Sequence, residues 1–448
     1  AGRVYIFYND GSIPTTAATA DVSITSTGSD GFGNKIATGD LNADGKTDLF
    51  GGGDINSYGL VYIFYNDGAY PTSVSSADVN ISNASNTTSK FGWALNAADF
   101  NGDGRADMAV GAYGYSSTTG RTYIFYNDGA YPSNGSGADV MITGEGSSTA
   151  FGRALASGDM NADGKIDLVV SAEDYGATDG KAYIFYSQNG VLNTNRNIAG
   201  EAGSGLGSAL VAGDFNADGR VDLVVGANTY SSHTGRTYIF YNDGSIPTTA
   251  TTADVIISGE ASSYFGVSLA VGDMNSDGTA DLIVGSSIYS SNTGRAYIFY
   301  NDGSIPTAAT TADVIITGES TGNYFGIALT TGDFNADGRV DLAGTAFLYG
   351  SVVGRAYIFY NDGSIPTTAA TADVIITGEA PSYQGRSIRG GDLNADGKGD
   401  LVVGADNYSS STGRVYIFYN DGSIPTTAAT ADVIIVGETS NNYFGQYF

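Results

Sequence analysis

The chain has 448 residues, 42% of them hydrophobic and 15% charged, so a large core is expected and a disordered chain is excluded. Its 47 acidic residues exceed its 19 Lys and Arg and give a formal charge of −28, which makes nucleic acid a poor partner. Without Cys, the sequence offers no disulfide, zinc thiolate or Cys nucleophile, and no stretch is apolar for long enough to predict membrane insertion.

A repeat of about 60 residues organises the chain. The pattern Asp-x-Asn-x-Asp-Gly-x-x-Asp begins at Asp40 and recurs at intervals of 59, 60, 55, 59, 60 and 59 residues. A period of this length without a helical pattern is typical of one four-stranded propeller blade. We therefore predict an all-β fold, a seven-bladed β-propeller with four-stranded antiparallel blades and no helices.

The whole chain, residues 1–448, is expected to form a single propeller domain. An extra strand hairpin is predicted at residues 1–27 and a tail at 438–448. The seven repeats cover about residues 28–83, 84–144, 145–200, 201–259, 260–318, 319–378 and 379–437.

Four strands are predicted within each repeat, in the same order. The first precedes the Asp-rich loop and is rich in small residues, as in 267–271, which suits the crowded axis of a propeller. The second follows the loop as a short apolar run such as 222–226, typical of a strand buried on both faces. The third is the Tyr-Ile-Phe-Tyr run, and the fourth is an outer edge strand such as 253–257.

Eight copies of Tyr-Ile-Phe-Tyr are present, and seven of them are followed by the turn signal Asn-Asp-Gly. These rings are interpreted as packing between blades rather than as a surface for stacking sugars. The copies begin at Tyr5, Tyr62, Tyr123, Tyr183, Tyr238, Tyr297, Tyr357 and Tyr416.

The seven Asp-rich loops are predicted to bind calcium, about seven Ca²⁺ in all, between the first and second strands. Side chains at loop positions 1, 3 and 5 supply oxygen donors, and Gly at position 6 allows the backbone to reverse sharply. Asp at position 9 completes the coordination shell of the ion. An all-oxygen donor set favours Ca²⁺ over transition metals, which prefer His or Cys. The predicted ligands are Asp40, Asn42, Asp44, Asp48, Asp99, Asn101, Asp103, Asp107, Asp159, Asn161, Asp163, Asp167, Asp214, Asn216, Asp218, Asp222, Asp273, Asn275, Asp277, Asp281, Asp333, Asn335, Asp337, Asp341, Asp392, Asn394, Asp396 and Asp400.

Phe-Gly, then the Asp-rich loop, then Gly-Ala resembles the FG-GAP repeat of integrin α-subunit propellers. Phe91-Gly92 with Gly111-Ala112 is one example. The resemblance covers essentially the whole chain and implies a seven-bladed propeller with its metal sites on one face, in an extracellular adhesive role. Two units depart from the motif: Leu206 replaces the Phe, and Gln384 stands before Gly385.

No catalytic residues are predicted, and the protein is expected not to be an enzyme. His233, the only His, lies in a polar turn and is interpreted as exposed. A recurring Glu is interpreted as a structural turn residue, because an active site is normally unique. Trp93 is interpreted as packing. The recurring acids are Glu145, Glu201, Glu260, Glu319, Glu379 and Glu438.

Two functions remain open from the sequence. The first is a cell-surface adhesion or structural protein that contacts protein or glycan ligands outside the cell, without nucleic acid and without membrane insertion. The second is a glycan-binding lectin with sites between blades, as the resemblance to FG-GAP lectins implies. A polysaccharide-degrading enzyme is disfavoured because catalytic residues are lacking.

Residues 2–22 are identical to residues 413–433, so a closed ring of seven blades would have two candidates for one place. We predict that one hairpin is left over and can pair with a neighbouring molecule, head-to-tail, to build a filament or surface array. Two alternatives stay open: the hairpin packs on its own ring, or the chain is one window on a longer array.

Overall fold

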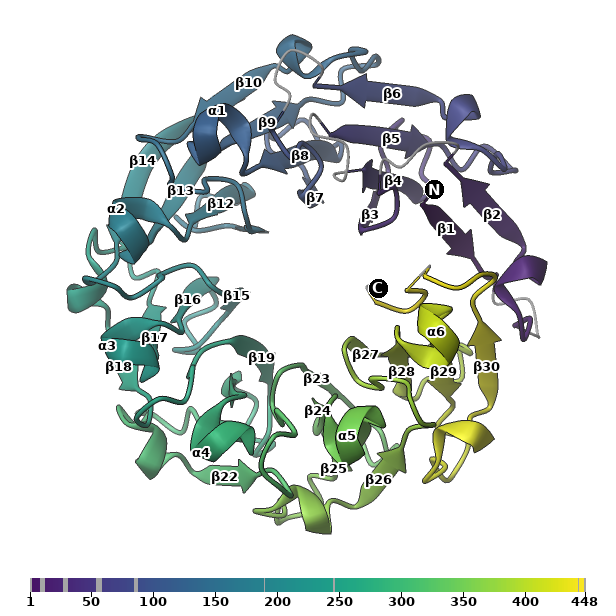
Figure 1. Ribbon diagram of the computed structural model, residues 1–448. Coiled ribbons are helices and arrows are strands. Elements are labelled where there is room, and N and C mark those ends of the chain that lie inside the picture. The colour runs from purple at the N-terminus through teal and green to yellow at the C-terminus, as the bar shows by residue number, and fades with distance from the viewer. Residues whose placement is uncertain are drawn as a thin grey trace.

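Seven four-stranded antiparallel sheets stand side by side in a ring, with their first strands nearest the centre (Figure 1). The computed structural model describes residues 2–8, 13–26, 31–53, 59–83, 88–188, 190–244, 246–441 and 443–446. Within each sheet the strands are hydrogen-bonded in chain order, so every blade is a simple meander. The predicted all-β seven-bladed propeller is confirmed.

Each blade falls inside one sequence repeat. Blade 1 is β3 (Lys35–Gly39), β4 (Asp48–Gly53), β5 (Leu60–Phe64) and β6 (Val79–Ser82); blade 2 is β7 (Ala94–Ala98), β8 (Asp107–Ala112), β9 (Arg121–Phe125) and β10 (Val140–Thr143). Blade 3 is β11 (Leu155–Gly158), β12 (Asp167–Ala172), β13 (Lys181–Gln188) and β14 (Val191–Ala199); blade 4 is β15 (Leu210–Gly213), β16 (Asp222–Ala227), β17 (Arg236–Phe240) and β18 (Val255–Ser258). Blade 5 is β19 (Ser268–Gly272), β20 (Asp281–Ser286), β21 (Arg295–Phe299) and β22 (Val314–Thr317); blade 6 is β23 (Leu329–Gly332), β24 (Asp341–Ala346), β25 (Arg355–Phe359) and β26 (Val374–Thr377). Blade 7 is β27 (Ile388–Gly391), β28 (Asp400–Ala405), β29 (Arg414–Phe418) and β30 (Val433–Val436).

Short helical turns join some of these strands, contrary to the expectation of no helices. Six four-residue turns follow the second strands of blades 2 to 7, and all six contain residues with positive φ, so they are tight reversals rather than regular helix. These are α1 (Tyr115–Thr118), α2 (Tyr175–Thr178), α3 (Tyr230–His233), α4 (Tyr289–Asn292), α5 (Tyr349–Val352) and α6 (Tyr408–Ser411). Three-residue 3₁₀ turns lie at 17–19, 74–76, 135–137, 250–252, 309–311, 369–371 and 428–430.

The repeated motifs are explained by contacts between neighbouring blades. The Phe of each Phe-Gly is buried edge-on against the Tyr of the third strand in its own blade, as Phe265 is against Tyr297 at 5.3 Å. A Cβ added to Gly226, in the Gly-Ala of blade 4, would lie 2.3 Å from the carbonyl oxygen of Gly266, in the Phe-Gly of blade 5. Glycine recurs at these places because the two backbones touch there.

The recurring Glu is structural, as the sequence predicts. Glu201 lies after the outer strand of blade 3 and forms an ion pair with Arg236 of blade 4, and its carboxylate accepts a hydrogen bond from Tyr238 at 2.8 Å. The Arg236 guanidinium also lies 3.9 Å from the centre of the Tyr230 ring. The same pairing recurs as Glu145–Lys181, Glu260–Arg295, Glu319–Arg355, Glu379–Arg414 and Glu438–Arg3.

The N-terminal hairpin occupies an eighth position in the ring, between blades 7 and 1 (Figure 1). It consists of β1 (Arg3–Ile6) and β2 (Val22–Thr25), which form a two-stranded sheet. Ala17 packs into an apolar cluster with β29 and β30, while Ile24 packs into a second cluster with β4 and β5. The hairpin therefore packs on its own ring, one of the alternatives that the sequence left open.

Candidate functional site

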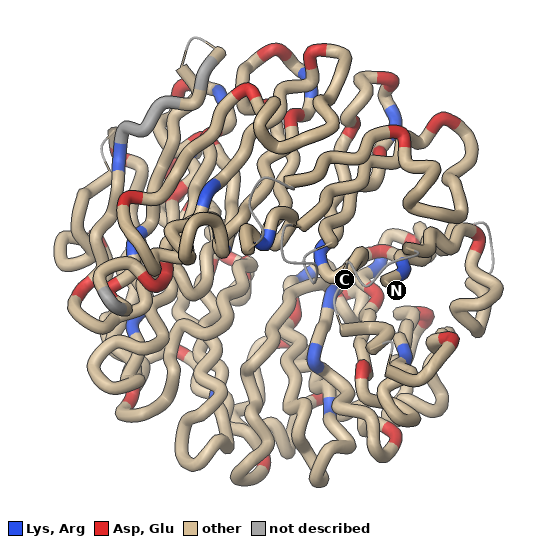
Figure 2. The backbone as a smooth tube through the Cα atoms, turned by 45° about the horizontal axis from the view of Figure 1, so that its top comes forward, with Lys and Arg blue, Asp and Glu red and all other residues tan. Residues whose placement is uncertain are grey.

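The meander places the connections of each blade on two opposite faces of the ring. The turns between first and second strands and between third and fourth strands lie on one face, which we call the loop face. The helical turns and the links from one blade to the next lie on the other, which we call the turn face. Asp and Glu residues occur on loops all around the ring, with fewer Lys and Arg residues among them (Figure 2).

The predicted calcium loops all lie on the loop face and share one geometry. In the first, Asp44 N donates to Asp40 Oδ1 at 3.1 Å and to Asn42 Oδ1 at 3.0 Å, so the oxygens of positions 1 and 3 both face the same backbone turn. Gly45 N donates to the other Asp40 oxygen, and the φ of Gly45 is +82°, which confirms the need for Gly at position 6.

The ninth residue of the loop is more deeply buried than the other three predicted calcium ligands. Asp48 is fully buried, with one oxygen accepting from Leu41 N at 2.8 Å and the other from Asn66 N at 2.7 Å. This carboxylate therefore ties the loop to the turn after the third strand. Burial raises the pKa of the equivalent Asp107 to about 6 and that of Asp167 to about 7, because the backbone hydrogen bonds to each carboxylate offset only part of the lost hydration.

The donor set of each loop is compatible with a calcium ion. Three Asp and one Asn offer oxygen atoms, and a carboxylate oxygen that accepts a single hydrogen bond keeps a second lone pair for an ion. The side chains are not drawn tightly together: among the described residues, no three His, Cys, Asp or Glu are grouped closely enough to hold an ion. Calcium in these loops stays a prediction.

On the turn face, two positions differ from repeat to repeat. The residue after Phe-Gly changes from blade to blade, and so does the residue after Gly-Ala, although the motifs around them recur. The first set is Asn34, Trp93, Arg153, Ser208, Val267, Ile327 and Arg386; the second is Tyr113, Glu173, Asn228, Ser287, Phe347 and Asp406 in blades 2 to 7. Blades of the same architecture thus carry a different pair of side chains each in blades 2 to 7.

These variable side chains contact one another across blade boundaries. The Arg153 guanidinium of blade 3 lies 5.7 Å from the Tyr113 ring of blade 2 and forms a 3.1 Å ion pair with Glu173. On the far side of the ring, Arg386 of blade 7 lies 5.9 Å from the Phe347 ring of blade 6. Trp93 meets Tyr113 edge-on at 4.8 Å, so it packs, as the sequence predicts, but within this variable surface.

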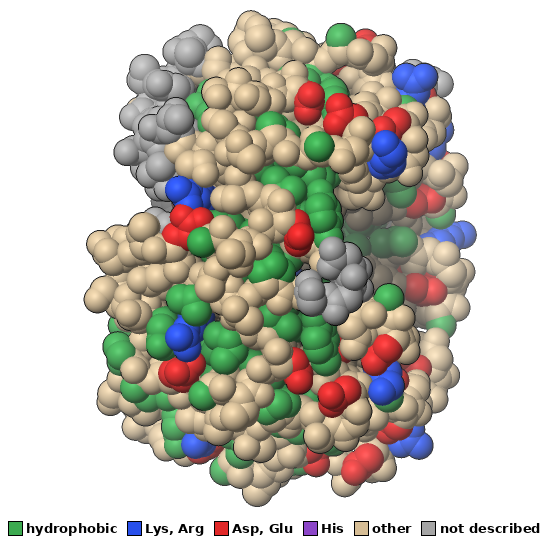
Figure 3. All heavy atoms as spheres, turned by 90° about the vertical axis from the view of Figure 1, so that its right-hand side faces the viewer, with side chains coloured by type: hydrophobic (Ala, Val, Ile, Leu, Met, Phe, Trp, Pro, Cys, Tyr) green, Lys and Arg blue, Asp and Glu red, His purple; other side chains and the backbone are tan. Residues whose placement is uncertain are grey.

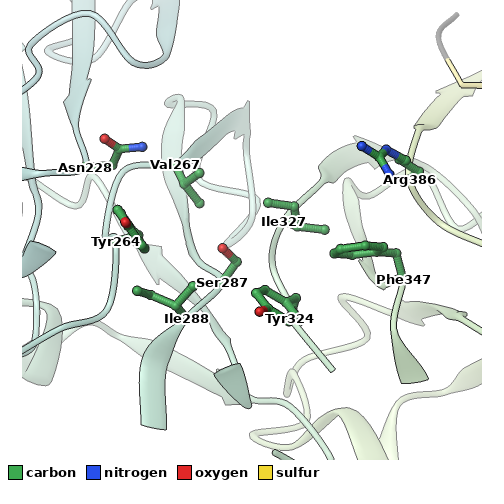
Figure 4. A pocket seen from close by; sticks show the side chains of 9 residues that line it. All are labelled: Asn228, Tyr264, Val267, Ser287, Ile288, Tyr324, Ile327, Phe347 and Arg386. Carbon is green, nitrogen blue, oxygen red and sulfur yellow. The ribbon is translucent and has the colours of Figure 1, made fainter. Parts of the chain in front are cut away.

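A pocket of about 380 Å³ opens where the variable residues of blades 4 to 7 meet (Figure 4). Tyr264, Tyr324 and Phe347 give it aromatic walls, and Arg386 lies at one end. The buried Oδ1 of Asn228 has no hydrogen-bond partner among the described residues. The pocket therefore combines apolar faces with polar groups available to a ligand, a combination typical of small binding sites. Its lining is completed by Val267, Ser287, Ile288 and Ile327.

The sequence did not identify this pocket, because its lining is shared among four repeats, with one residue from blade 4, four from blade 5, three from blade 6 and one from blade 7. A comparison of the repeats position by position would have found it, since the lining coincides with the places where they differ. His233 is exposed on α3, as predicted, and its ring lies 4.5 Å from the ring of Tyr264. In the part of the chain that the structure describes, no helix is long and apolar enough to cross a membrane.

Comparisons with known proteins give one consistent family. Models of the FG-GAP repeat match residues 91–125 and 384–418, and a model described as an FG-GAP-like repeat matches 159–225 and 214–284. The chain is 31% identical to integrin alpha-PS2 of Drosophila melanogaster over 55% of its own length and 18% of that protein. It is 36% identical to the phosphatidylinositol-glycan-specific phospholipase D of Homo sapiens over 31% of its length and, again, 18% of the relative.

These matches therefore span about a fifth of each curated relative. Among solved structures, a rhamnogalacturonan lyase of Bacillus licheniformis covers 92% of the chain and 73% of its own at 12% identity, with a TM-score of 0.41. That likeness is too weak to bear on fold or activity.

Proposed function

Because the chain is a seven-bladed β-propeller of FG-GAP repeats with sequence similarity to integrin α-subunits, we propose that it is a non-enzymatic, extracellular, calcium-binding adhesion protein. The observation that carries this proposal is the set of turn-face side chains that differ from blade to blade around recurring motifs. A scaffold that repeats its core and changes its surface presents many side chains over a broad area, as a protein-binding face requires. One of the two relatives described above is an integrin subunit, which supports the adhesive role.

We assign ligand binding to the pocket and its rim. Phe347 and Tyr324 present aromatic rings 5.6 Å apart, and Arg386 adds a cation beside them. Aromatic and Arg side chains are those that most often dominate the free energy of protein association. The six recurring Glu residues are not assigned to ligand binding, because their carboxylates pair with Arg, Lys and Tyr side chains of the protein itself.

Phe347→Ala is expected to weaken adhesion to ligand-bearing cells at least about tenfold, because it removes the aromatic wall of the pocket. The ring is half-buried and lies outside the apolar clusters that join blades 5 to 7, so only a small change in the melting midpoint is expected. The measurement is cell adhesion to immobilised protein, with Met141→Ala as the control. Met141 is exposed and lies on the outer strand β10, outside the pocket. Equal adhesion by Phe347→Ala and the parent would exclude the pocket as the ligand-binding site.

Glycan binding is the second candidate, favoured by aromatic walls beside the unpartnered Asn228 oxygen in a small pocket. A glycan array separates the two functions. Saturable binding to one glycan class that is lost in Phe347→Ala supports a lectin, whereas cell adhesion that persists after glycans are removed supports a protein ligand.

Calcium in the loops is supported by the recurrence of one oxygen-rich geometry in seven blades. Asp277→Ala is expected to remove one ion and leave the other six sites occupied, since contacts between repeats are mostly nearest-neighbour. Native mass spectrometry should count seven ions in the parent, six in this variant and seven in the control Asp302→Ala. Asp302 is exposed in the Asn-Asp-Gly turn of the same blade, outside the loop. A parent with one or two ions would contradict the proposal for most loops.

We also propose that chains can associate head-to-tail by exchange of the N-terminal hairpin. The hairpin leaves its own ring and takes the same place in a neighbour, as in domain swapping. Light scattering at high protein concentration should give a mass above that of the monomer for the parent and the monomer mass after deletion of residues 1–26. Two monomeric proteins would contradict the exchange.

A further inference from the structure

Two of the aromatic side chains that line the pocket stand at a backbone position that does not favour them. Tyr264 and Tyr324 each precede the Phe of a Phe-Gly, and their φ angles are +53° and +60°. This left-handed region is costly for a bulky residue and easy for Gly, which holds the equivalent position of blade 4 as Gly205, with a φ of +59°. Glycine would suit the backbone better, so the tyrosines are explained by the surface that their rings provide.

The turns of the preceding blades hold these two tyrosines in place. Tyr264 N donates to His233 O at 2.9 Å, and Tyr324 N donates to Asn292 O at 2.8 Å. The Tyr324 hydroxyl also accepts a hydrogen bond from Asn292 Nδ2 at 3.0 Å. The two walls are therefore formed before a ligand arrives, and a preformed site loses less conformational entropy when it binds.

The surface between the rings is mostly hydrocarbon. Three aliphatic side chains lie among the aromatic ones, those of Val267, Ile288 and Ile327 (Figure 4). A sugar needs a hydrogen-bond partner for each hydroxyl that it buries, whereas an apolar side chain needs only such a hydrocarbon surface. The lining therefore favours a protein segment with a large apolar side chain over a glycan.

Arg386 is the cation of the pocket, and its charge is only partly paired. Its Nε lies 3.7 Å from Asp406 Oδ2, and its terminal nitrogens make no hydrogen bond to the residues that the structure describes. Arg153 holds the same position in blade 3, but its Nε lies 3.1 Å from Glu173 and its Nη1 lies 4.0 Å from Asp174. Blade 3 thus surrounds its Arg with two acids, whereas Arg386 keeps donors available for the carboxylate of a ligand.

The opposite end of the pocket needs a hydrogen-bond donor. Asn228 Oδ1 is buried without a partner among the described residues, and Figure 4 shows Asn228 across the pocket from Arg386. A backbone N–H of an extended segment supplies that donor. Because the lining runs from blade 4 to blade 7, it suits a segment that crosses several blades.

The charge of the whole chain limits how acidic the ligand can be. The formal charge is −28, and Asp and Glu side chains are scattered over the side of the ring seen in Figure 3, with fewer Lys and Arg among them. This field repels a segment with many carboxylates, whereas Arg386 can offset a single one. The pocket therefore suits a segment with one acid rather than an acidic tract.

On the premise of the proposed ligand-binding function, we propose that the pocket takes an extended segment of a protein partner with one large apolar side chain and a single Asp or Glu beside it. The apolar side chain packs among Tyr264, Tyr324 and Phe347. The carboxylate accepts hydrogen bonds from Arg386, and a backbone N–H of the segment donates to Asn228 Oδ1.

Random seven-residue peptides displayed on phage test the proposal. Phage that bind Phe347→Ala are removed first, and the rest are panned on the immobilised 448-residue protein in calcium. Peptides with one large apolar residue and one Asp or Glu are expected to be enriched. A synthetic copy with capped ends should bind saturably in fluorescence anisotropy, and it should bind at least about tenfold more weakly when its acid is replaced by the matching amide.

A double-mutant cycle assigns that carboxylate to Arg386. Arg386→Gln should weaken binding of the acidic peptide at least about tenfold and leave that of the amide peptide nearly unchanged, while Arg386→Lys should recover part of the loss. The matched control is Arg153→Gln, at the same position of blade 3, which should bind both peptides as the parent does. The melting midpoint shows whether each variant is folded, and the amide peptide tests the charge on the parent even where a variant is not.

Four outcomes would overturn the proposal. These are no enriched peptide, as expected of a lectin, enriched peptides without an acid, equal binding of the acidic and amide peptides, and an equal effect of Arg386→Gln on both. Cell adhesion separates such a failure from failure of the proposed function. Adhesion that is lost in Phe347→Ala but complete in Arg386→Gln would reject the acidic ligand and keep the pocket, whereas unchanged adhesion in Phe347→Ala would reject the pocket as the adhesive site.

Discussion

Removal of calcium with a chelator is expected to lower the melting midpoint strongly, the largest effect that we anticipate. Each loop carries three carboxylates, and one of them, such as Asp222, is fully buried with its pKa raised by burial to about 6. Without a cation, ionised carboxylates in these loops destabilise the folded state. An ion that binds only the native state adds about 2.7 kcal/mol per site when its concentration is a hundred times its dissociation constant.

The measurement is thermal melting followed by circular dichroism, in calcium and in chelator. Magnesium serves as the control cation, since it demands a tighter octahedral shell than these loops offer, and it should restore little of the loss. An unchanged midpoint in chelator would refute a structural role for calcium and would leave the turn-face proposal intact.

Phe325→Ala is expected to cost about 3–5 kcal/mol of the free energy of unfolding, because it empties a fully buried ring position between blades. The Phe325 ring contacts Tyr357 at 5.5 Å and Phe359 at 6.1 Å, and it belongs to the apolar cluster that joins blades 5 and 6. Denaturant unfolding measures the loss. A cost below about 1 kcal/mol would show that neighbouring side chains collapse into the space.

Blade 7 provides the converse test at the same place in the repeat. Gln384 is fully buried there, and its Oε1 has no hydrogen-bond partner among the described residues. Gln384→Phe is therefore expected to stabilise the protein by about 1–3 kcal/mol, since an unsatisfied polar atom is replaced by the ring that other blades carry. A destabilised Gln384→Phe would mean that blade 7 cannot accommodate a ring there.

Most of the architecture could be predicted because each blade repeats the same local signals. The apolar run at 222–226 became β16, one residue longer, and the Tyr-Ile-Phe-Tyr runs became the third strands. The outer strand expected at 253–257 begins two residues later, at Val255. The reason is local: the side chain of Asp254 accepts from Tyr241 N and so holds the turn ahead of the strand.

Other features could not be predicted, because they depend on contacts between repeats. Residues 2–22 and 413–433 are identical, so sequence alone cannot say which copy completes blade 7; chain connectivity in the ring decides it. Leu206 and Gln384 both replace the Phe of Phe-Gly, and the sequence did not predict that their environments differ. Leu206 keeps an apolar contact, whereas Gln384 buries an amide. The pocket draws Asn228, Val267 and Arg386 from three different repeats, and only the closed ring brings them together.

The identity of residues 2–22 with 413–433 has a consequence for the kinetics of folding. During synthesis the N-terminal copy emerges first, and it can pair with β28 before the native partner β29 has been made. That pairing forms the same hydrogen bonds and packs the same side chains as the native one. It is therefore a kinetic trap, which must unfold before the ring can close. Near-identical neighbours are prone to such misassembly. We therefore expect slow refolding phases whose amplitude grows as more blades become alike in sequence. The similarity between repeats thus delays closure of the ring.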